Sequence, residues 1–166
     1  MMKVQACADM SAVRGLLPML KRNLRITGDD NDAVLVEKLL AAVTNAGHYI
    51  GGFCVPTIVT VTGKVSSTSI TLRGPVISLT SVVVDGVAVE GCTLDGNVLT
   101  LPSGSEGKTV AVEYRAGYCP APPDMVAAIV LIASSLYTGP LDTVEVLPKA
   151  SSNLLRNYRW LNGEGQ

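Results

Sequence analysis

The sequence predicts an α+β protein: a helical body of about four helices that carries an inserted antiparallel β module of five to six strands. Apolar residues recur at helical spacing in the first and last thirds of the chain, and short β-branched runs between turn signals fill the middle third. With 166 residues, the chain is long enough to bury a core without cross-links. We therefore expect an N-terminal helical part (residues 1–53), the β module (54–116), a C-terminal helical part (117–160) and a flexible tail (161–166).

The N-terminal part contains two helical patterns. In "MSAVRGLLPMLKRNLRI" the apolar residues lie at helical spacing, and Pro18 predicts a kink or a break. The second pattern, over residues 33–50, has one apolar stripe and is followed by Gly51 and Gly52, which suit a helix C-terminus.

The acidic segment "GDDND" lies between these two patterns. A calcium loop needs alternating acidic residues with a glycine in the middle, whereas here the glycine comes first and the acidic residues are consecutive. We expect that Asp30, Asn31 or Asp32 caps the following helix and that the other charges favour its dipole.

The β module consists of short β-branched runs separated by turns. The pairs Asp85-Gly86 and Asp95-Gly96 predict hairpins, and the alternation in "KTVAVEY" predicts a strand with one buried face. The expected strands lie in "TIVTVTG", "TSITLRG", "VISLTSVVVDG", "VAVEGCTL", "NVLTLP" and "KTVAVEY".

The most apolar segment of the chain follows the β module. No polar side chain occurs from Met125 to Ala133, prolines precede the run, and Gly139 follows it, so we expect a helix over residues 123–137. At 1.5 Å per residue this helix reaches about 22 Å, which is shorter than the roughly 30 Å hydrocarbon core of a bilayer. We therefore expect no membrane span, and the helix must be covered by its own fold, by neighbouring copies, or by both.

Charge and composition exclude several function classes. A net charge of −1 does not predict tight binding to nucleic acid, which needs a concentrated basic face. The four cysteines are scattered and predict small apolar fillers rather than a metal site. A lone Asp9 interrupts the first apolar stretch, unlike a signal peptide, so we expect synthesis in the cytoplasm.

No motif for catalysis is evident. His48 is the single imidazole and lies late in a helix, where a surface or interface position is expected. The segment "GSEGK" at residues 104–108 lacks the first glycine of a phosphate loop and lies between strands. We expect a protein that is not an enzyme, with no catalytic residue, no bound metal and no cofactor.

The order of five motifs along the chain is more informative than any one of them. "LRITGDD" stands before the second helix, and "LRGPV" enters a strand. "YRAGY" ends the last strand, "PPDMVAAIVLIASSLY" forms the apolar helix, and "LPKASSNLLRNYRW" closes the chain. Over residues 20–160 this order resembles the head-tail connector (adaptor) family of tailed bacteriophages, prophages and gene transfer agents. The chain departs from the family where the apolar helix ends without a charge and where the link from Gly139 to Leu147 is short.

The resemblance implies a structural role in the virion neck, after synthesis in the host cytoplasm. Such an adaptor forms a homo-oligomeric ring, expected to have twelve copies, beneath the portal protein. The ring extends the channel and offers a surface to a stopper or tail-completion protein. Genomic DNA passes through the channel without sequence-specific binding, and no membrane is involved.

The resemblance also points to two groups of residues. The apolar helix is expected to face helix 33–50 on one side and a neighbouring copy on another, so its residues belong to the core or to a ring interface: Val126, Ala128, Ile129, Ile132 and Ala133. Family members insert their C-terminal ends into the portal, and the basic, aromatic end of this chain predicts a docking segment: Leu154, Arg156, Tyr158, Arg159, Trp160 and Leu161. The alternative for this segment is a tail helix that packs on its own core.

Two other functions remain open from the sequence. A stopper or tail-completion protein of the same connector would stack on an adaptor ring rather than on the portal. A cytosolic ligand-binding β module with helical flanks would remain monomeric and would contain a ligand pocket.

Overall fold

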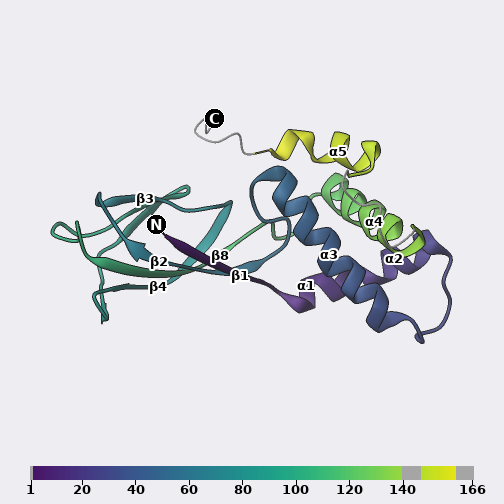
Figure 1. The fold of residues 1–166 in the computed structure, drawn as a ribbon, viewed down its shortest axis with the longest axis horizontal. Helices are drawn as coiled ribbons and strands as arrows, with labels where there is room; N and C mark the ends of the chain where they lie inside the picture. The colour runs from purple at the N-terminus through teal and green to yellow at the C-terminus, as the bar shows by residue number, and fades with distance from the viewer. Residues whose placement is uncertain (1, 140–146, 160–166) are drawn as a thin grey trace. The chain divides into compact units, whose positions relative to one another are not determined.

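The computed structural model describes residues 2–139 and 147–159, and it confirms the predicted α+β fold (Figure 1). The chain divides into two compact units. The β unit comprises Met1–Cys7 and Pro56–Gly117, and the helical unit comprises Ala8–Val55 and Tyr118–Gln166. Each unit is therefore built from segments that are far apart in the sequence.

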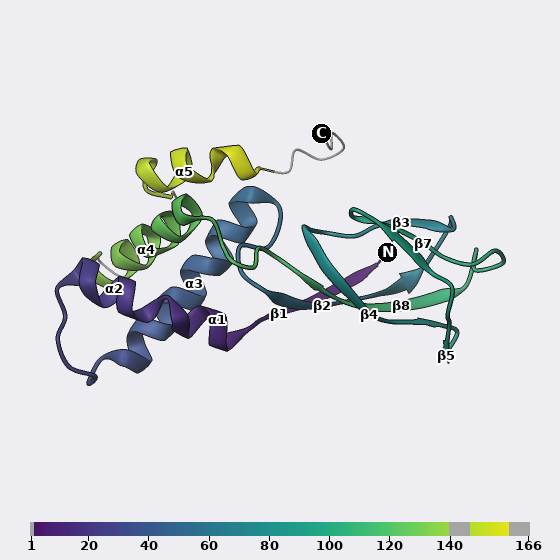
Figure 2. The same cartoon turned by 180° about the vertical axis from the view of Figure 1, so that it is seen from behind.

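The β unit contains two antiparallel layers of hydrogen-bonded strands (Figure 2). The larger sheet has the order β1-β2-β8-β4-β5, in which β8 pairs with both β2 and β4, and the smaller sheet has the order β3-β7-β6. The strands are β1 (Lys3–Ala8), β2 (Thr57–Lys64), β3 (Ser69–Thr71), β4 (Val76–Val84), β5 (Val87–Ala88), β6 (Thr93–Asp95), β7 (Val98–Thr100) and β8 (Thr109–Ala116).

The central strand β8 has the alternation that the sequence predicts. Val110, Val112 and Tyr114 are at most 2% exposed, whereas Thr109 and Arg115 are exposed. The buried hydroxyl of Tyr114 donates a hydrogen bond to the Arg73 carbonyl oxygen at 3.0 Å, which satisfies its only polar atom. This bond joins the "YRAGY" motif to the "LRGPV" motif within the β unit.

Asn97 holds the start of β4 in place. Its side-chain oxygen Oδ1 accepts a hydrogen bond from the Val76 amide at 3.0 Å, and its carbonyl oxygen accepts one from Leu72 at 2.7 Å. A Cβ atom at Gly74 would collide with the Asn97 side chain. The glycine of the "LRGPV" motif is therefore required by the close approach of Asn97.

Of the two predicted hairpin turns, the first lies at the predicted residues and the second is displaced by one residue. Asp85 and Gly86 have φ of 48° and 83° and are the two central residues between Val84 and Val87, as predicted. The second turn is centred on Gly96 and Asn97, one residue later than predicted, because Asp95 already pairs with Val98.

The run "VAVEGCTL" was expected to be a single strand, and this was wrong. It divides into β5 and β6, which belong to different sheets. Gly91 lies at the division with φ of 85°, a conformation that ends an L-residue strand. The β module therefore has more strands than the five to six that were expected.

The strand β1 was not expected, because residues 1–53 were assigned to the helical part. Five of its six residues are exposed, so this edge strand has no buried face. Backbone pairing holds such a strand, and pairing leaves little trace in the pattern of side chains.

The helical unit contains five α-helices and one 3₁₀ turn among its described residues. Pro18 lies in the first turn of α2, and the preceding Leu16 marks the break that the sequence predicts. The elements are α1 (Met10–Gly15), α2 (Leu17–Leu24), α3 (Asp32–Ile50), α4 (Pro123–Thr138), α5 (Lys149–Leu155) and η1 (Arg156–Tyr158).

The acidic segment before α3 is held by a lysine. Asn31 occupies the N-cap position of α3, as one of the three expected residues, but its side chain makes no capping hydrogen bond. Lys21 Nζ contacts Asp29 Oδ1 at 2.8 Å and Asp32 Oδ1 at 2.7 Å. These hydrogen bonds raise the pKa of Lys21 and lower the pKa of Asp29. The carboxylates therefore join the α2–α3 loop to α2.

Helix α4 lies in the middle of the helical unit, where it packs against α3, α5 and α2 (Figure 1). Its inner residues Ala128, Ile129, Ile132 and Ala133 are fully buried within the single chain. They pack with residues of α3 such as Leu39 and Ala42 in one continuous core. Among the described residues, no helix combines the length and the apolar character needed to cross a membrane.

The two adjacent alanines of α4 provide a matched test of this packing. Ala128 is fully buried and Ala127 is exposed. Ala128→Asp would bury a charge without a partner, and we expect it to lower the free energy of unfolding by about 3 kcal/mol or more. Ala127→Asp should cost about 1 kcal/mol or less, because an exposed site adds only the difference in helix propensity. Urea unfolding followed by circular dichroism measures both values, and equal losses would contradict the orientation of α4.

Candidate interaction surface

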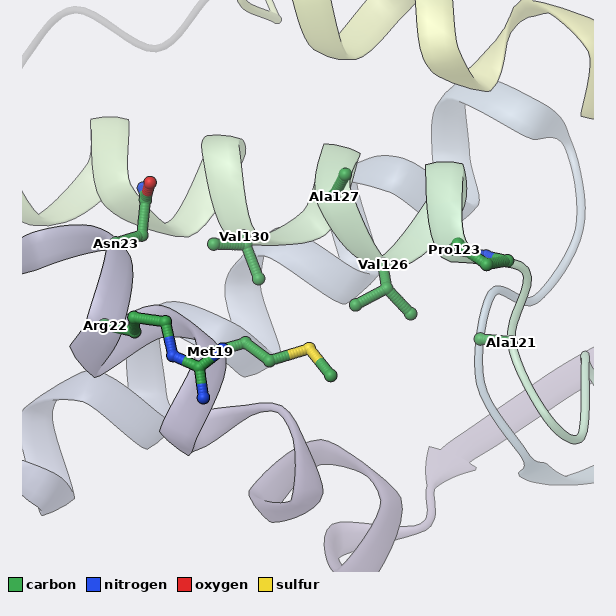
Figure 3. A pocket seen from close by; sticks show the side chains of 8 residues that line it. All are labelled: Met19, Arg22, Asn23, Ala121, Pro123, Val126, Ala127 and Val130. Atoms are coloured by element: carbon green, nitrogen blue, oxygen red, sulfur yellow. The ribbon is translucent and has the colours of Figure 1, made fainter.

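The outer face of α4 forms one wall of an apolar groove in the helical unit (Figure 3). The groove has a volume of about 640 Å³, and α2 forms the opposite wall. We call it the α2/α4 groove, and its lining residues are Met19, Arg22, Asn23, Ala121, Pro123, Val126, Ala127 and Val130.

The α4 wall follows from helical periodicity. Pro123, Val126, Ala127 and Val130 lie at positions i, i+3, i+4 and i+7, so they share the face opposite to the buried one. Val130 is 8% exposed and forms the floor, whereas Pro123 and Ala127 are open to solvent. Helix α4 is thus apolar on both faces, and only the inner face is fully covered by the chain itself.

The α2 wall supplies the largest apolar side chain and the single charge of the groove. Met19 is 49% exposed, although it is apolar. Asn23 Nδ2 donates a hydrogen bond to Ser134 Oγ at 2.7 Å and so ties α2 to α4 at one end. Among the described residues, the guanidinium of Arg22 makes no ion pair.

A second feature of the helical unit is the set of contacts that Tyr158, near the end of the described chain, makes with Asp124 and Tyr118. The Tyr158 hydroxyl donates a hydrogen bond to Asp124 Oδ1 at 2.7 Å, and the Tyr158 ring meets the edge of Tyr118 at 5.6 Å between centroids. The bond to Asp124, with smaller contributions from burial and from the Asp124 charge, raises the pKa of Tyr158 to about 12. The same carboxylate belongs to the first turn of α4, so it connects the start of α4 to the end of the described chain.

The structure places three of the six predicted docking residues against the chain's own helical unit. Leu154 and Tyr158 are partly buried and pack against the helical core, and Arg159 lies 5.2 Å from the ring centroid of Tyr49. Arg156 is exposed, and Trp160 and Leu161 lie outside the described residues. The helix itself ends at Leu155 and continues as a 3₁₀ turn. Up to Arg159, the segment therefore has the contacts expected of a tail that packs on its own core.

The residues predicted for the core or a ring interface divide in a similar way. Ala128, Ile129, Ile132 and Ala133 are covered within the chain, and Val126 lines the α2/α4 groove. The predicted site residues did not include Met19, Arg22 or Asn23, which complete the groove from α2. A helical wheel of α2 would have found Met19, because it lies outside the stripe formed by Leu17, Leu20 and Leu24.

The next residues to consider are the histidine, the cysteines and the acidic side chains, which could take part in catalysis or bind a metal. His48 is exposed, and no three His, Cys, Asp or Glu side chains of the described chain cluster as metal ligands. Cys54 is a buried filler, as expected, and burial raises its pKa to about 12. Cys7 and Cys119 are exposed, so the expectation that all cysteines fill the interior was wrong.

Three solved structures share the fold over nearly the whole chain. A chain from the neck of an empty GTA particle, computed with C6 symmetry, has a TM-score of 0.77 at 18% identity, and the match covers 99% of this chain and 98% of that one. A chain from the neck of a native GTA particle, computed with C12 symmetry, has a TM-score of 0.75 at 19% identity, with 99% and 98% covered. A chain from the virion of a native gene transfer agent particle has a TM-score of 0.72 at 19% identity, with 100% and 98% covered.

No protein-family model and no curated protein sequence matches the chain. At such low identity, the three structures establish the fold of this chain and leave its function to be argued separately.

The Tyr158–Asp124 hydrogen bond gives a prediction with a defined pH dependence. Tyr158→Phe should lower the free energy of unfolding by roughly 1 kcal/mol at neutral pH, because a bond at a partly exposed site is screened by solvent. The folded pKa of about 12 lies above the ordinary value of 10, so the stabilisation is complete below pH 10 and is lost as the pH rises toward 12. Urea unfolding across this range should show the difference between wild type and variant closing.

Tyr137→Phe is the matched control, since the Tyr137 hydroxyl has no hydrogen-bond partner in the part of the chain that the structure describes. If the difference in free energy of unfolding between wild type and Tyr158→Phe stayed constant from pH 9 to pH 12, as it should for Tyr137→Phe, the Tyr158–Asp124 bond would be contradicted.

Proposed function

We propose that this chain is a structural protein of the neck of a tailed phage or gene transfer agent particle, and that it acts there as a head-tail connector adaptor. In this role, twelve copies form a ring beneath the portal protein and extend the DNA channel. The far side of the ring receives a stopper or tail-completion protein. The protein binds DNA without sequence specificity or not at all, and it catalyses no reaction.

The observation that carries the proposal is the agreement between two independent kinds of similarity. The five motifs occur in the order typical of adaptor proteins. The fold matches neck chains from end to end, with 98% or more of both chains aligned. A shared β module alone would align only part of the chain, so the match includes the way in which the two helical segments flank the β unit in sequence.

The composition of the two interaction surfaces supports a role in assembly rather than in catalysis. The groove is apolar with one charge at its rim, which is typical of the centre of a protein–protein contact. The net charge of −1 suits a channel through which DNA slides, because a strongly basic lining would retain phosphate. The C12 symmetry of a similar neck supports the ring of twelve.

A gene deletion tests the proposal directly. Cells that lack this gene should accumulate DNA-filled heads without tails, and the purified protein should restore tail attachment when it is added to those heads. Negative-stain microscopy should show a ring of added density at the portal vertex. Normally tailed particles in the deletion strain would refute the structural role. Added density that appears only when another neck protein has already bound the portal would instead indicate a stopper.

We further propose that the portal contact is made by the last residues of the chain. Three of the four charged residues from Lys149 onward are basic, but all three precede residue 160, so the support for the last residues is the large aromatic side chain of Trp160. Tyr158 and Arg159 already contact Asp124 and Tyr49, so they anchor the segment rather than meet the portal. The docking role thus moves toward residues 160–166.

Removal of residues 160–166 tests this second proposal. The truncated protein keeps Tyr158 and Arg159, so its free energy of unfolding should match wild type within about 0.5 kcal/mol. Its attachment to portal-bearing heads should be lost, and Trp160→Ala alone should weaken attachment by roughly 2 kcal/mol, the threshold for a binding hot spot. Attachment of the truncated protein at wild-type affinity would place the portal contact elsewhere on the chain.

A further inference from the structure

We infer that the α2/α4 groove is the surface on which the next copy in the ring docks, and that the docking element of that copy is the exposed face of α3. The inference rests on the proposed function and specifies which two surfaces meet. It commits the groove to a second copy of this chain, with Arg22 of one copy facing Glu37 of the next.

The exposed face of α3 is a second apolar surface of the helical unit. Val34 is 44% exposed and Leu40 is 38% exposed, and the smaller Ala41 is also open to solvent. These three residues lie on the side of α3 that faces away from the helical core. The opposite side carries the buried residues Leu39, Ala42, Val43 and Ala46. Helix α3 is amphipathic toward its own core, yet its outer face is not fully polar.

The charges on the two surfaces are opposite in sign. Of the described residues that line the groove, only Arg22 is charged. Glu37 lies between Val34 and Ala41 on the exposed face of α3. Within the described residues, neither side chain has an ion-pair partner, so a contact between copies would pair two charges that this part of the chain does not pair.

The shapes also fit. Ala127 is exposed on the α4 wall, and Ala41 is exposed on α3 one turn after Glu37. Small residues on both helices allow them to approach to the lower end of the usual range of about 8–10 Å. Leu40 and Val34 would then enter the groove beside Met19, which is exposed in the single chain.

The two surfaces differ from each other, and this determines the kind of assembly. A contact between unlike surfaces of identical chains is heterologous, and it produces a closed ring when the rotation between copies closes. In a two-fold dimer, both contacts would form at once across one axis, so that Arg22 meets Glu37 twice. The mass of the assembly therefore distinguishes a ring from a dimer.

Charge reversal tests the contact in the full-length protein. Arg22→Glu and Glu37→Arg should each weaken association between copies about tenfold or more, because each places like charges opposite one another. The double variant should recover most of the association, since the pair is restored with its signs exchanged. Ring formation is measured by mass photometry and negative-stain microscopy of the protein alone and on portal-bearing heads.

Two control variants separate the contact from effects on folding. Lys64→Glu reverses an exposed charge at the end of β2, in the β unit and outside both surfaces, and should leave the rings unchanged. Ala127→Asp should remain folded and yet fail to form rings, because it places a carboxylate in the apolar groove. In the Arg22→Lys variant, a zero-length carbodiimide reagent should join Lys at position 22 to Glu37 of another copy, as an amide found by mass spectrometry in the covalent dimer.

The outcomes distinguish this inference from the proposed function. If wild type forms no ring either alone or on heads, the adaptor function fails and the inference fails with it. If wild type forms rings that both single reversals leave intact, only the inference is refuted and the ring contact lies elsewhere. Loss of rings in both single variants without recovery in the double variant would also refute the direct pairing of Arg22 with Glu37.

Discussion

The helical unit depends on the need to cover α4. After Asp124 this helix has no charged side chain. Two of its hydroxyl groups donate hydrogen bonds to the helix backbone: Ser134 Oγ to the Val130 carbonyl at 2.8 Å, and Thr138 Oγ1 to the Ser134 carbonyl at 2.9 Å. A helix of this kind gains little from contact with water on any side. Helices α2, α3 and α5 surround it, although they come from both ends of the chain. The β unit can be inserted between α3 and α4 because this core closes without it, as the separate hydrophobic cluster of the helical unit shows.

Asp124 has two roles in the helical unit. As the acidic residue in the first turn of α4, it suits the helix dipole, and it also accepts the Tyr158 hydrogen bond that holds the end of the chain. This arrangement explains why residues with the composition of a docking segment are partly buried. Tyrosine and arginine are enriched at binding hot spots, but the same amphipathic character makes them good anchors within a chain. Composition alone cannot distinguish a binding hot spot from an anchor within the chain. The contacts of Tyr158 and Arg159 do distinguish them.

The sequence predicts the elements that have a buried face and misses those that do not. Helices α3 and α4 and strand β8 repeat apolar residues with a clear period, so their positions were predicted to within one or two residues. Strand β1 is held by backbone pairing and shows no such period. The division of "VAVEGCTL" depends on the backbone conformation of Gly91, and the second hairpin turn is shifted because Asp95 pairs with Val98. The groove was missed for a related reason: its walls come from helices about 100 residues apart, and only the packed structure shows which faces meet.

A ring that assembles at a portal needs contacts that are specific but individually weak. If each contact between copies were strong, rings would close in the cytoplasm before any head was ready to receive them. A groove with modest apolar residues gives limited affinity, and one opposite pair of charges fixes the register without adding much net stability. Binding of each copy to the portal would then raise the effective concentration of its neighbours, and the weak contacts would close the ring together. The same surfaces would be suited to a protein that is monomeric until it reaches the portal. In the proposed ring, the apolar character of α4 would serve two purposes: its inner face stabilises the fold, and its outer face would contact the neighbouring copy.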